Sequence, residues 1–257
     1  MSSETVDKSC FQHRLKILVA CEESQRVCIE FRNKGHEAYS CDIIECSGNH
    51  PEWHIMGDVI PLLNGDCEFE TTDGIKHKID GKWDIIIAFP PCTYLTSAGT
   101  RHYSLKCNPP EKVAARIEKR NEAEQFFLKI ANADCEKIAI ENPVGYMNTH
   151  WRKPNQIVHP YYFASSKNDA ENYFQKRTCL WLKNLPVLDR KNNLPVPEPQ
   201  YICQGKKCKG KRIGWCEGIK NTTGGQAGRA KARSKTFPGI AKAMADQWGM
   251  KGLIKDE

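Results

Sequence analysis

Two short runs of this 257-residue sequence each join a reactive side chain to prolines, which form rigid turns. In Phe89-Pro90-Pro91-Cys92 the reactive group is a thiol, and in Glu141-Asn142-Pro143 it is a carboxyl. A cysteine is a strong nucleophile only as its thiolate, and a buried carboxyl can hold a proton near neutral pH. Cys92 is therefore a candidate nucleophile, and Glu141 is a candidate for a carboxyl that keeps or shares a proton.

Each run also has a purely structural interpretation. Free cysteines are among the most buried residue types, so Cys92 can equally be an inert thiol behind a proline turn. Glu141 can equally cap a helix or lie on the surface. The positions of the two residues in the fold decide between these interpretations.

Short apolar runs predict the strands that carry these residues. Residues 15–20 suit a buried parallel strand, and residues 83–89 form the clearest central strand, which stops at the prolines before Cys92. Residues 37–42 and 137–141 are further strands. Helices are expected between the first two strands and over residues 111–134.

Strands that alternate with helices predict an α/β fold with a Rossmann-like, doubly wound parallel sheet. Such sheets bind ligands beyond the carboxyl ends of their strands. The residues expected at these ends are Cys21, Glu22, Ser24, Asp42, Asp58, Cys92 and Glu141.

Composition narrows the class of protein. Hydrophobic residues make up 40% and charged residues 27%, as in ordinary globular proteins. Residues 1–13 form a polar leader without an apolar run behind it, and no stretch reaches the length of a membrane span. We therefore expect a cytoplasmic protein without a membrane partner, in which most of the 13 cysteines are reduced and buried.

Residues 149–228 form an irregular segment rich in proline, asparagine, lysine and aromatic residues. Between Cys203 and Lys235 there are ten lysines or arginines and one acidic residue, Glu217. Basic residues interleaved with aromatic ones suit contacts with phosphates and bases, and Lys211 and Arg212 are the candidates for such contacts. The alternative is a basic loop without this function.

Three cysteines of this segment, Cys203, Cys208 and Cys216, are spaced closely enough to contribute to a zinc site. A fourth ligand, such as Cys179 or His159, would have to come from a distant part of the chain. Zinc ribbons have paired, closely spaced ligands, so we leave this question open and predict no metal.

The runs at Cys92 and Glu141, together with Gly57-Asp58-Val59, resemble the cytosine-5 DNA methyltransferases. The sequence looks closest to the short members found in phages and prophages, because Leu18-Val-Ala-Cys-Glu-Glu-Ser24, Tyr39-Ser-Cys-Asp42 and residues 233–245 are typical of them. The likeness is collinear over about residues 14–145 and 229–250.

The resemblance implies a function for each part of the chain. Residues 14–148 and 229–250 would form the catalytic domain, and residues 149–228 a target-recognition segment that binds DNA. Cys92 would attack carbon 6 of a flipped-out cytosine, and Glu141 would stabilise protonation at ring nitrogen 3. Carbon 5 would then take the methyl group. Arg177, in a Gln-x-Arg element, would contact the activated base, and Asn142 would bind substrate or orient the Glu141 loop.

The methyl donor implied by the resemblance is S-adenosylmethionine. Asp42 would bind the ribose hydroxyls, as acids at the end of a second strand usually do, and Asp58 the adenine amino group. The residues expected near the methionine part, in the first loop and at the proline turn, are Cys21, Glu22, Ser24 and Pro90.

The sequence also departs from the family. Its first loop, Cys21 to Gln25, has none of the glycines that let the family's backbone approach the donor. Thr93-Tyr94-Leu95 stands where glutamine and phenylalanine-serine are usual, and Pro143 stands where valine is usual.

Two alternatives stay open. The first is a DNA-binding or host-interference protein that keeps this fold with little or no catalytic activity. The second is a cytosine methyltransferase that acts on RNA, since the chemistry applies to any accessible cytosine. In every case we expect a monomer.

Overall fold

The structure is a computed structural model and describes residues 14–199, 201–203, 209–214, 228 and 232–250. The expected leader, residues 1–13, lies outside these ranges, as do Cys208, Cys216 and Glu217.

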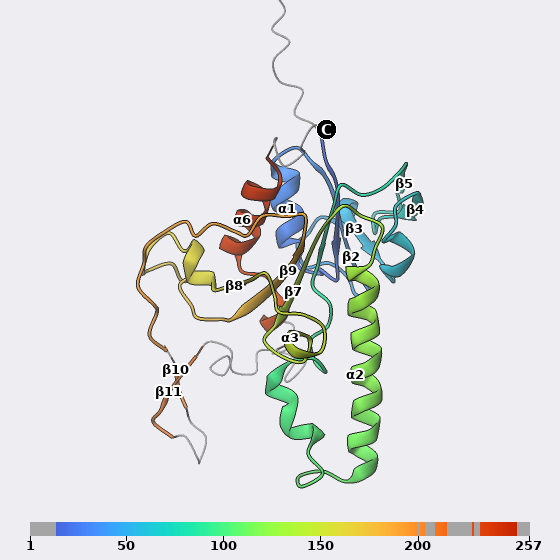
Figure 1. Ribbon diagram of the computed structural model, residues 1–257. Helices are drawn as coiled ribbons and strands as arrows, with labels where there is room; N and C mark the ends of the chain where they lie inside the picture. Colours follow the sequence, from blue (N-terminus) through green and yellow to red (C-terminus); the bar gives the residue numbers. More distant parts are fainter. Residues whose placement is uncertain (1–13, 200, 204–208, 215–227, 229–231, 251–257) are drawn as a thin grey trace, which may run out of the picture.

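The centre of the fold is a sheet of seven strands (Figure 1). Five neighbouring strands are parallel; β9 pairs with the last of them in the antiparallel sense, and β8 pairs antiparallel with β9. In spatial order the strands are β3 (His54–Met56), β2 (Glu37–Asp42), β1 (Lys16–Ala20), β6 (Ile85–Ala88), β7 (Lys137–Pro143), β9 (Thr178–Lys183) and β8 (Gln156–Val158). This mostly parallel α/β sheet agrees with the Rossmann-like class expected from the sequence.

The central strands are buried on both faces, which explains their unbroken apolar sequence. Alternate residues of β1 belong to two different cores, Ile17 and Val19 to one and Leu18 and Ala20 to the other. The residues of β6 divide in the same way. The sheet therefore separates two apolar layers, and both must be covered by other elements.

Helices α1 (Arg26–Asn33) and α6 (Pro238–Trp248) cover one face of the sheet and pack against each other (Figure 1). The C-terminal helix thus joins the domain begun by β1. Helix α2 (Pro110–Ala131) covers the other face through Phe127 and Ile130. Its N-terminal half continues past the edge of the sheet, beside the 3-10 helix η3 (Ser97–Tyr103) (Figure 1).

The smaller elements lie around this core. Strands β4 (Cys67–Glu70) and β5 (Lys76–Ile79) form an antiparallel hairpin, as do β10 (Tyr201–Ile202) and β11 (Arg212–Ile213). The short helices are η1 (Pro51–Trp53), η2 (Ile60–Leu62), α3 (Met147–His150) and η4 (Pro160–Phe163).

The sheet extends into the segment that the sequence set apart. Strands β8 and β9 lie within residues 149–228, yet β9 pairs with β7 along the length of both strands. The expected boundary at residues 148 and 149 therefore does not coincide with an edge of the sheet. This pairing also explains why β7 runs to Pro143, although the sequence predicted that Asn142-Pro143 would end it: Asn142 and Pro143 face Cys179 and Thr178 of β9.

The contribution of α6 to the stability of the fold can be measured by truncating the side chain of Trp248. This side chain is 1% exposed, and its Nε1 donates to the carbonyl of Pro186 at 3.0 Å. We expect Trp248→Ala to lower the free energy of unfolding by about 3–5 kcal/mol. Met250, just beyond the helix, is 62% exposed, and Met250→Ala should change stability by less than about 0.5 kcal/mol. Equal effects of the two changes in denaturant unfolding would refute a structural role for α6.

Candidate functional site

The candidate residues meet at the carboxyl edge of the sheet. Strands β1 and β6 are neighbours here, at the point where the strand order reverses. The ladder continues past their ends, because the backbone N–H of Phe89 donates to Ala20 at 2.9 Å and that of Glu22 to Cys41 at 3.2 Å. The loops after β1, β2 and β6 therefore begin side by side, as the sequence predicted.

Cys92 and Glu141 stand on two loops that are bonded to each other. The side-chain amide of Asn142 donates to the carbonyl of Pro90 at 2.8 Å, which ties the end of β7 to the proline turn. Cys92 is exposed and Glu141 is half-buried. Neither is enclosed in the core, so the interpretation of Cys92 as a buried structural thiol is wrong.

The charge of Glu141 also acts on the thiol of Cys92. The surrounding protein removes part of the water around the Cys92 sulfur, although the residue reaches the surface, and this burial raises the pKa of the thiol. The carboxylate of Glu141 raises the pKa of Cys92 further. Burial likewise raises the pKa of Glu141 above that of an ordinary carboxyl. The carboxylate of Glu141 therefore lies within electrostatic reach of the Cys92 thiol.

A second set of bonds joins the two loops farther from the strands. The backbone N–H of Tyr146 donates to Leu95 at 2.7 Å, and that of Ser97 to Val144 at 3.1 Å. Gly145 lies so close that a Cβ there would come within 2.0 Å of the carbonyl oxygen of Leu95. Only glycine fits this contact, so the loops are held in one fixed arrangement.

Lys176 is a further candidate site residue, which the sequence did not single out. It lowers the pKa of both Glu141 and Cys92, and its Nζ donates to the carbonyl of Arg233 at 3.2 Å. Arg233 also lowers the pKa of Cys92. Two cations, from segments far apart in the sequence, thus compensate the negative charge of the thiol and carboxyl pair.

Arg177, the expected third catalytic residue, has different neighbours. It is exposed, and its charge acts on His159 and Cys179. Alternation along the extended chain explains this difference. Glu141 pairs with Leu180 of β9, and Lys176 is four residues before Leu180, so Lys176 is on the same face of the extended chain as Leu180. Arg177 is two residues before Cys179 and is therefore on the opposite face. The alternation of residues 175–182 is visible in the sequence, but which of its two faces carries Glu141 depends on the pairing of β9 with β7. A catalytic role of Arg177 stays a prediction.

Three of the residues expected to bind the methyl donor lie together. Burial raises the pKa of the Cys21 thiol, and the carboxylates of Asp42 and Asp58 raise it further. Asp42 is half-buried, and burial raises the pKa of its carboxyl. Asp58 is exposed and accepts a hydrogen bond from the backbone of Ile60 at 3.0 Å. Acids from the ends of two neighbouring strands therefore flank one thiol.

Exposed apolar side chains stand beside these acids. Ile43 follows Asp42 and is 78% exposed, and Met56 faces Asp42 across the β2–β3 pair and is 55% exposed. These two side chains therefore add apolar surface beside the carboxylates of Asp42 and Asp58. The edge can therefore hold a ligand that has both an apolar face and hydrogen-bonding groups.

The first loop is held by Glu22 and not by glycines. Glu22 is buried, and its carboxylate oxygens accept the backbone N–H groups of Val27 at 2.7 Å and Cys28 at 3.2 Å, in the first turn of α1. Burial raises the pKa of Glu22 to about 8. Both oxygens are thus engaged by α1, so Glu22 shapes the loop. Ser24 is buried in the same loop.

Two non-glycine residues of this loop adopt left-handed backbone conformations. The backbone of Cys21 has φ 59° and that of Gln25 has φ 57°, both in the left-handed region. Each such residue costs about 1–2 kcal/mol. The buried Gln25 side chain offsets this cost, because its Nε2 donates to the carbonyl of His50 at 2.8 Å and its Oε1 accepts from the His50 N–H at 3.1 Å.

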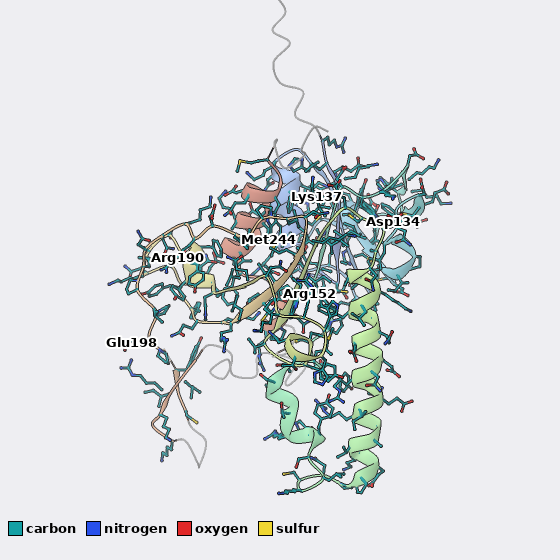
Figure 2. All side chains as sticks on the ribbon, in the orientation of Figure 1. Asp134, Lys137, Arg152, Arg190, Glu198 and Met244 are labelled. Carbon is teal, nitrogen blue, oxygen red and sulfur yellow. The ribbon has the colours of Figure 1, made fainter. Side chains whose placement is uncertain are left out.

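The expected substrate contacts Lys211 and Arg212 lie on a separate hairpin. Both are exposed, and Arg212 pairs with Glu198 at 2.8 Å. Figure 2 shows Glu198 far from Lys137 of β7 and from Met244 of α6. The role of these two basic residues stays a prediction.

Of the three cysteines weighed as zinc ligands, Cys203 alone lies within the described residues, and it is bound in a disulfide. Within those residues no three histidines, cysteines or acids are grouped so that they could hold a metal ion.

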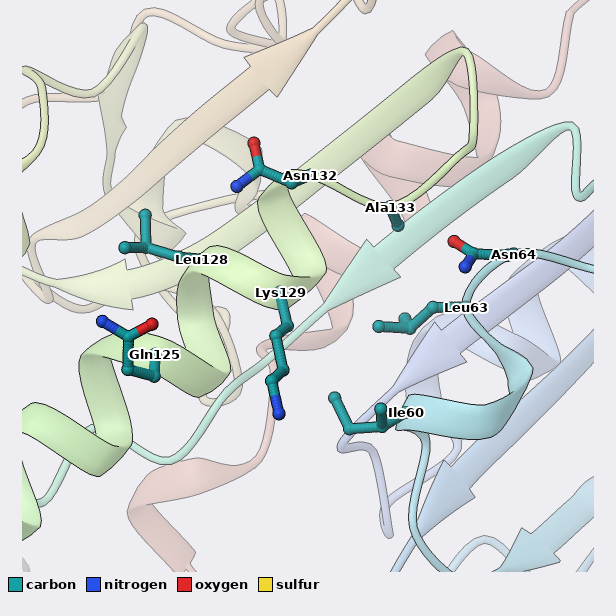
Figure 3. Close-up of a pocket in the computed structure, with 8 residues that line it drawn as sticks. All are labelled: Ile60, Leu63, Asn64, Gln125, Leu128, Lys129, Asn132 and Ala133. Atoms are coloured by element: carbon teal, nitrogen blue, oxygen red, sulfur yellow. The ribbon is translucent and has the colours of Figure 1, made fainter.

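A hollow of about 430 Å³ opens on another part of the surface, between α2 and the turn after η2 (Figure 3). Its lining residues are Ile60, Leu63, Asn64, Gln125, Leu128, Lys129, Asn132 and Ala133. None of them is a candidate catalytic or donor-binding residue, so we do not assign the chemistry to this hollow.

Comparisons with known proteins assign the chain to no family. No family of known proteins matches the chain, and no curated protein matches it in sequence. Among the described helices, none is both long and apolar enough to span a membrane.

The coupling of thiol and carboxyl predicts how Cys92 responds to pH. Alkylation of Cys92 by iodoacetamide should show a midpoint above the pKa of an ordinary thiol, because burial and Glu141 both disfavour the thiolate. Glu141→Gln removes one of these two effects, so the midpoint should move to lower pH. Residue-resolved mass spectrometry follows Cys92, with the exposed Cys107 in the same digest as a control. An unchanged midpoint in Glu141→Gln would show that the carboxylate of Glu141 does not act on the thiol of Cys92.

Lys176 and Arg177 can be told apart by the same measurement. Lys176→Met removes a cation that favours the thiolate, so the midpoint for Cys92 should rise. Arg177→Met is the matched control and should leave the midpoint nearly unchanged. A raised midpoint in Arg177→Met with an unchanged midpoint in Lys176→Met would show that Arg177, and not Lys176, acts on Cys92.

Proposed function

We propose that this protein transfers a methyl group from S-adenosylmethionine to carbon 5 of cytosine in DNA. One observation carries the proposal. The exposed thiol of Cys92 and the half-buried carboxyl of Glu141 lie on loops joined by the Asn142–Pro90 hydrogen bond, close enough for the carboxylate to raise the pKa of the thiol. Covalent activation of a pyrimidine ring requires this pair of groups around one base.

The roles proposed for Cys92 and Glu141 follow from the low reactivity of carbon 5 in the aromatic ring of cytosine. Carbon 5 becomes nucleophilic only after the Cys92 thiolate has added to carbon 6 and pushed an electron pair into the ring. Protonated Glu141 neutralises the charge that builds at nitrogen 3. Its raised pKa keeps that proton available closer to neutral pH. Carbon 5 would take the methyl group as the methyl–sulfur bond of the donor breaks and a neutral thioether leaves. Loss of the carbon 5 proton to water and departure of the thiolate would then restore the aromatic ring.

The sheet edge at Asp42 and Asp58 fits the methyl donor, whose sulfonium supplies an electrophilic methyl group. An acid at the end of the second strand is the usual partner of ribose hydroxyls, and Asp42 stands there. Asp58 can accept a hydrogen bond from an adenine amino group. The exposed side chains of Ile43 and Met56 offer apolar surface to the adenine ring. Cys21 stands between this edge and the proline turn.

The charges around the site favour a polyanionic substrate. The charges of Lys176 and Arg233 act on the thiol, and neither residue is paired with a carboxylate among the described residues. The exposed Lys211 and Arg212 extend the basic character to the β10–β11 hairpin. Such side chains can neutralise the phosphates of DNA on both sides of an extruded base.

Asn142 also supports base binding. Its side chain is 1% exposed, and its Oδ1 has no hydrogen-bond donor in the described part of the chain, although its Nδ2 is engaged by Pro90. A buried acceptor without a partner is costly, and a bound base can supply the missing donor.

The proposal is tested by the fate of cytosine in cells that express the protein. Mass spectrometry of DNA nucleosides should find 5-methylcytosine with the wild-type chain. Cys92→Ser should lower transfer by on the order of 10⁴-fold or more, because the covalent route is lost, whereas calorimetry should find donor binding nearly intact. The matched control Cys107→Ser changes an exposed thiol outside the site and should keep full activity.

Labelled donor incubated in parallel with DNA and with RNA defines the substrate. Transfer to DNA is expected, and transfer to RNA alone would overturn the assignment. Donor binding without transfer to either nucleic acid would refute the enzyme and favour a protein that only binds. Full activity of Cys92→Ser would remove Cys92 from the mechanism.

A further inference from the structure

We propose that Arg116 and Arg120 of α2 are positioning residues that set the thiol of Cys92 against the carboxyl of Glu141. They do so by stacking on tyrosines from both loops. The catalytic consequence rests on the proposed function, whereas the effect on the thiol and carboxyl pair does not depend on it.

Cationic and aromatic side chains alternate along one side of α2. The guanidinium carbon of Arg116 lies 5.1 Å from the ring centres of both Tyr94 and Tyr103. That of Arg120 lies 4.7 Å from Tyr103 and 4.3 Å from Tyr146. Because the arginines are four residues apart, they share a face of the helix. Together the five side chains form an arginine–tyrosine stack, in the order Tyr94, Arg116, Tyr103, Arg120, Tyr146.

The two ends of the arginine–tyrosine stack come from the two functional loops. Tyr94 is two residues beyond Cys92, and Tyr146 is five residues beyond Glu141. The middle ring, Tyr103, belongs to η3. Since both arginines stand on one rigid helix, the stack fixes the distance between the two loops.

Hydrogen bonds hold each end in place. Arg116 Nη2 donates to the carbonyl of Thr93 at 3.3 Å, next to the nucleophile. The hydroxyl of Tyr103 donates to the carbonyl of Tyr94 at 2.8 Å, and that of Tyr146 to Glu124 of α2 at 3.4 Å. The loop of Cys92 and the loop of Glu141 are thus both docked on α2.

The arginines are held by aromatic rings and not by ion pairs. Both are half-buried, neither is paired with a carboxylate within the described ranges, and the Nε atom of each is buried without a hydrogen-bond partner. A planar guanidinium can stack on a ring at each of its two faces, which a lysine or methionine cannot do.

The arginine–tyrosine stack is separate from the apolar core. Helix α2 contributes to the core of the sheet through Phe127 and Ile130, near its C-terminus. Arg116 and Arg120 stand on the part of α2 that runs past the sheet beside η3 (Figure 1). Their loss should therefore alter the geometry of the loops more than the stability of the domain.

The first experiment measures how strongly Glu141 acts on Cys92 in the presence and absence of the stack. The pH midpoint for alkylation of Cys92 is determined with Glu141 and with Glu141→Gln, first in the wild-type background and then with Arg120→Met. We expect Arg120→Met to reduce the shift caused by Glu141→Gln by at least half. The matched control is Lys119→Met, an exposed neighbour on α2, which should leave the full shift. Thermal unfolding of each variant verifies that it is folded.

A second pair of variants covers the case in which Arg120→Met does not fold. Tyr146→Ala removes a ring of the stack and should reduce the shift, whereas Tyr146→Phe keeps the ring and should preserve it. A purely structural role would lower the melting temperature without changing the shift. A full shift in both Arg120→Met and Tyr146→Ala overturns the proposal.

Steady-state kinetics then connect the stack to catalysis. Arg120→Met should lower kcat by on the order of 10- to 100-fold, as expected for reacting groups misplaced by about 1 Å, with little change in KM for the donor. An unchanged kcat would remove the catalytic consequence. If the wild-type chain transfers no methyl group, the proposed function fails, yet the alkylation result still decides whether the stack positions the two groups.

Discussion

The parallel pairing of β6 with β7 is the constraint on which the site depends. It aligns Ala88, the last residue of β6, with Ile140, so that Glu141 follows directly beyond the level at which β6 ends. The proline turn then lifts Cys92 out of the sheet, and the bond from Asn142 to Pro90 fixes this turn to the end of β7. Without that pairing, a thiol and a carboxyl 49 positions apart in the sequence would have no reason to meet.

Burial and charge oppose each other at this meeting point. Removal of water raises the pKa of both Cys92 and Glu141 and so favours their neutral forms. Lys176 and Arg233 act in the opposite direction on the thiol. In such an environment small displacements of a charged group have large effects, because screening by water is weak. A site of this kind needs rigid support, and the bonds between the two loops and their docking on α2 supply it.

The parts of the structure that follow from local sequence could be predicted, and the parts that follow from distant contacts could not. The unbroken apolar runs of β1, β6 and β7 identified central strands, and the residues after them identified the edge that carries Cys92, Asp42 and Glu141. The apolar sequence of β9 is typical of a strand, yet nothing local reveals that it pairs with β7. Docking of loops on α2 depends on residues far apart in the chain and leaves no periodic signal.

The covalent bond between Cys92 and cytosine is the central claim, and trapping that bond tests it most directly. Fluorine at carbon 5 of cytosine cannot leave as a proton does, so the thiolate cannot be eliminated after methyl transfer. DNA that contains 5-fluorocytosine, incubated with the protein and the methyl donor, should yield a covalent complex whose peptide map places the base on Cys92. No complex, or a complex through another residue, would contradict the account.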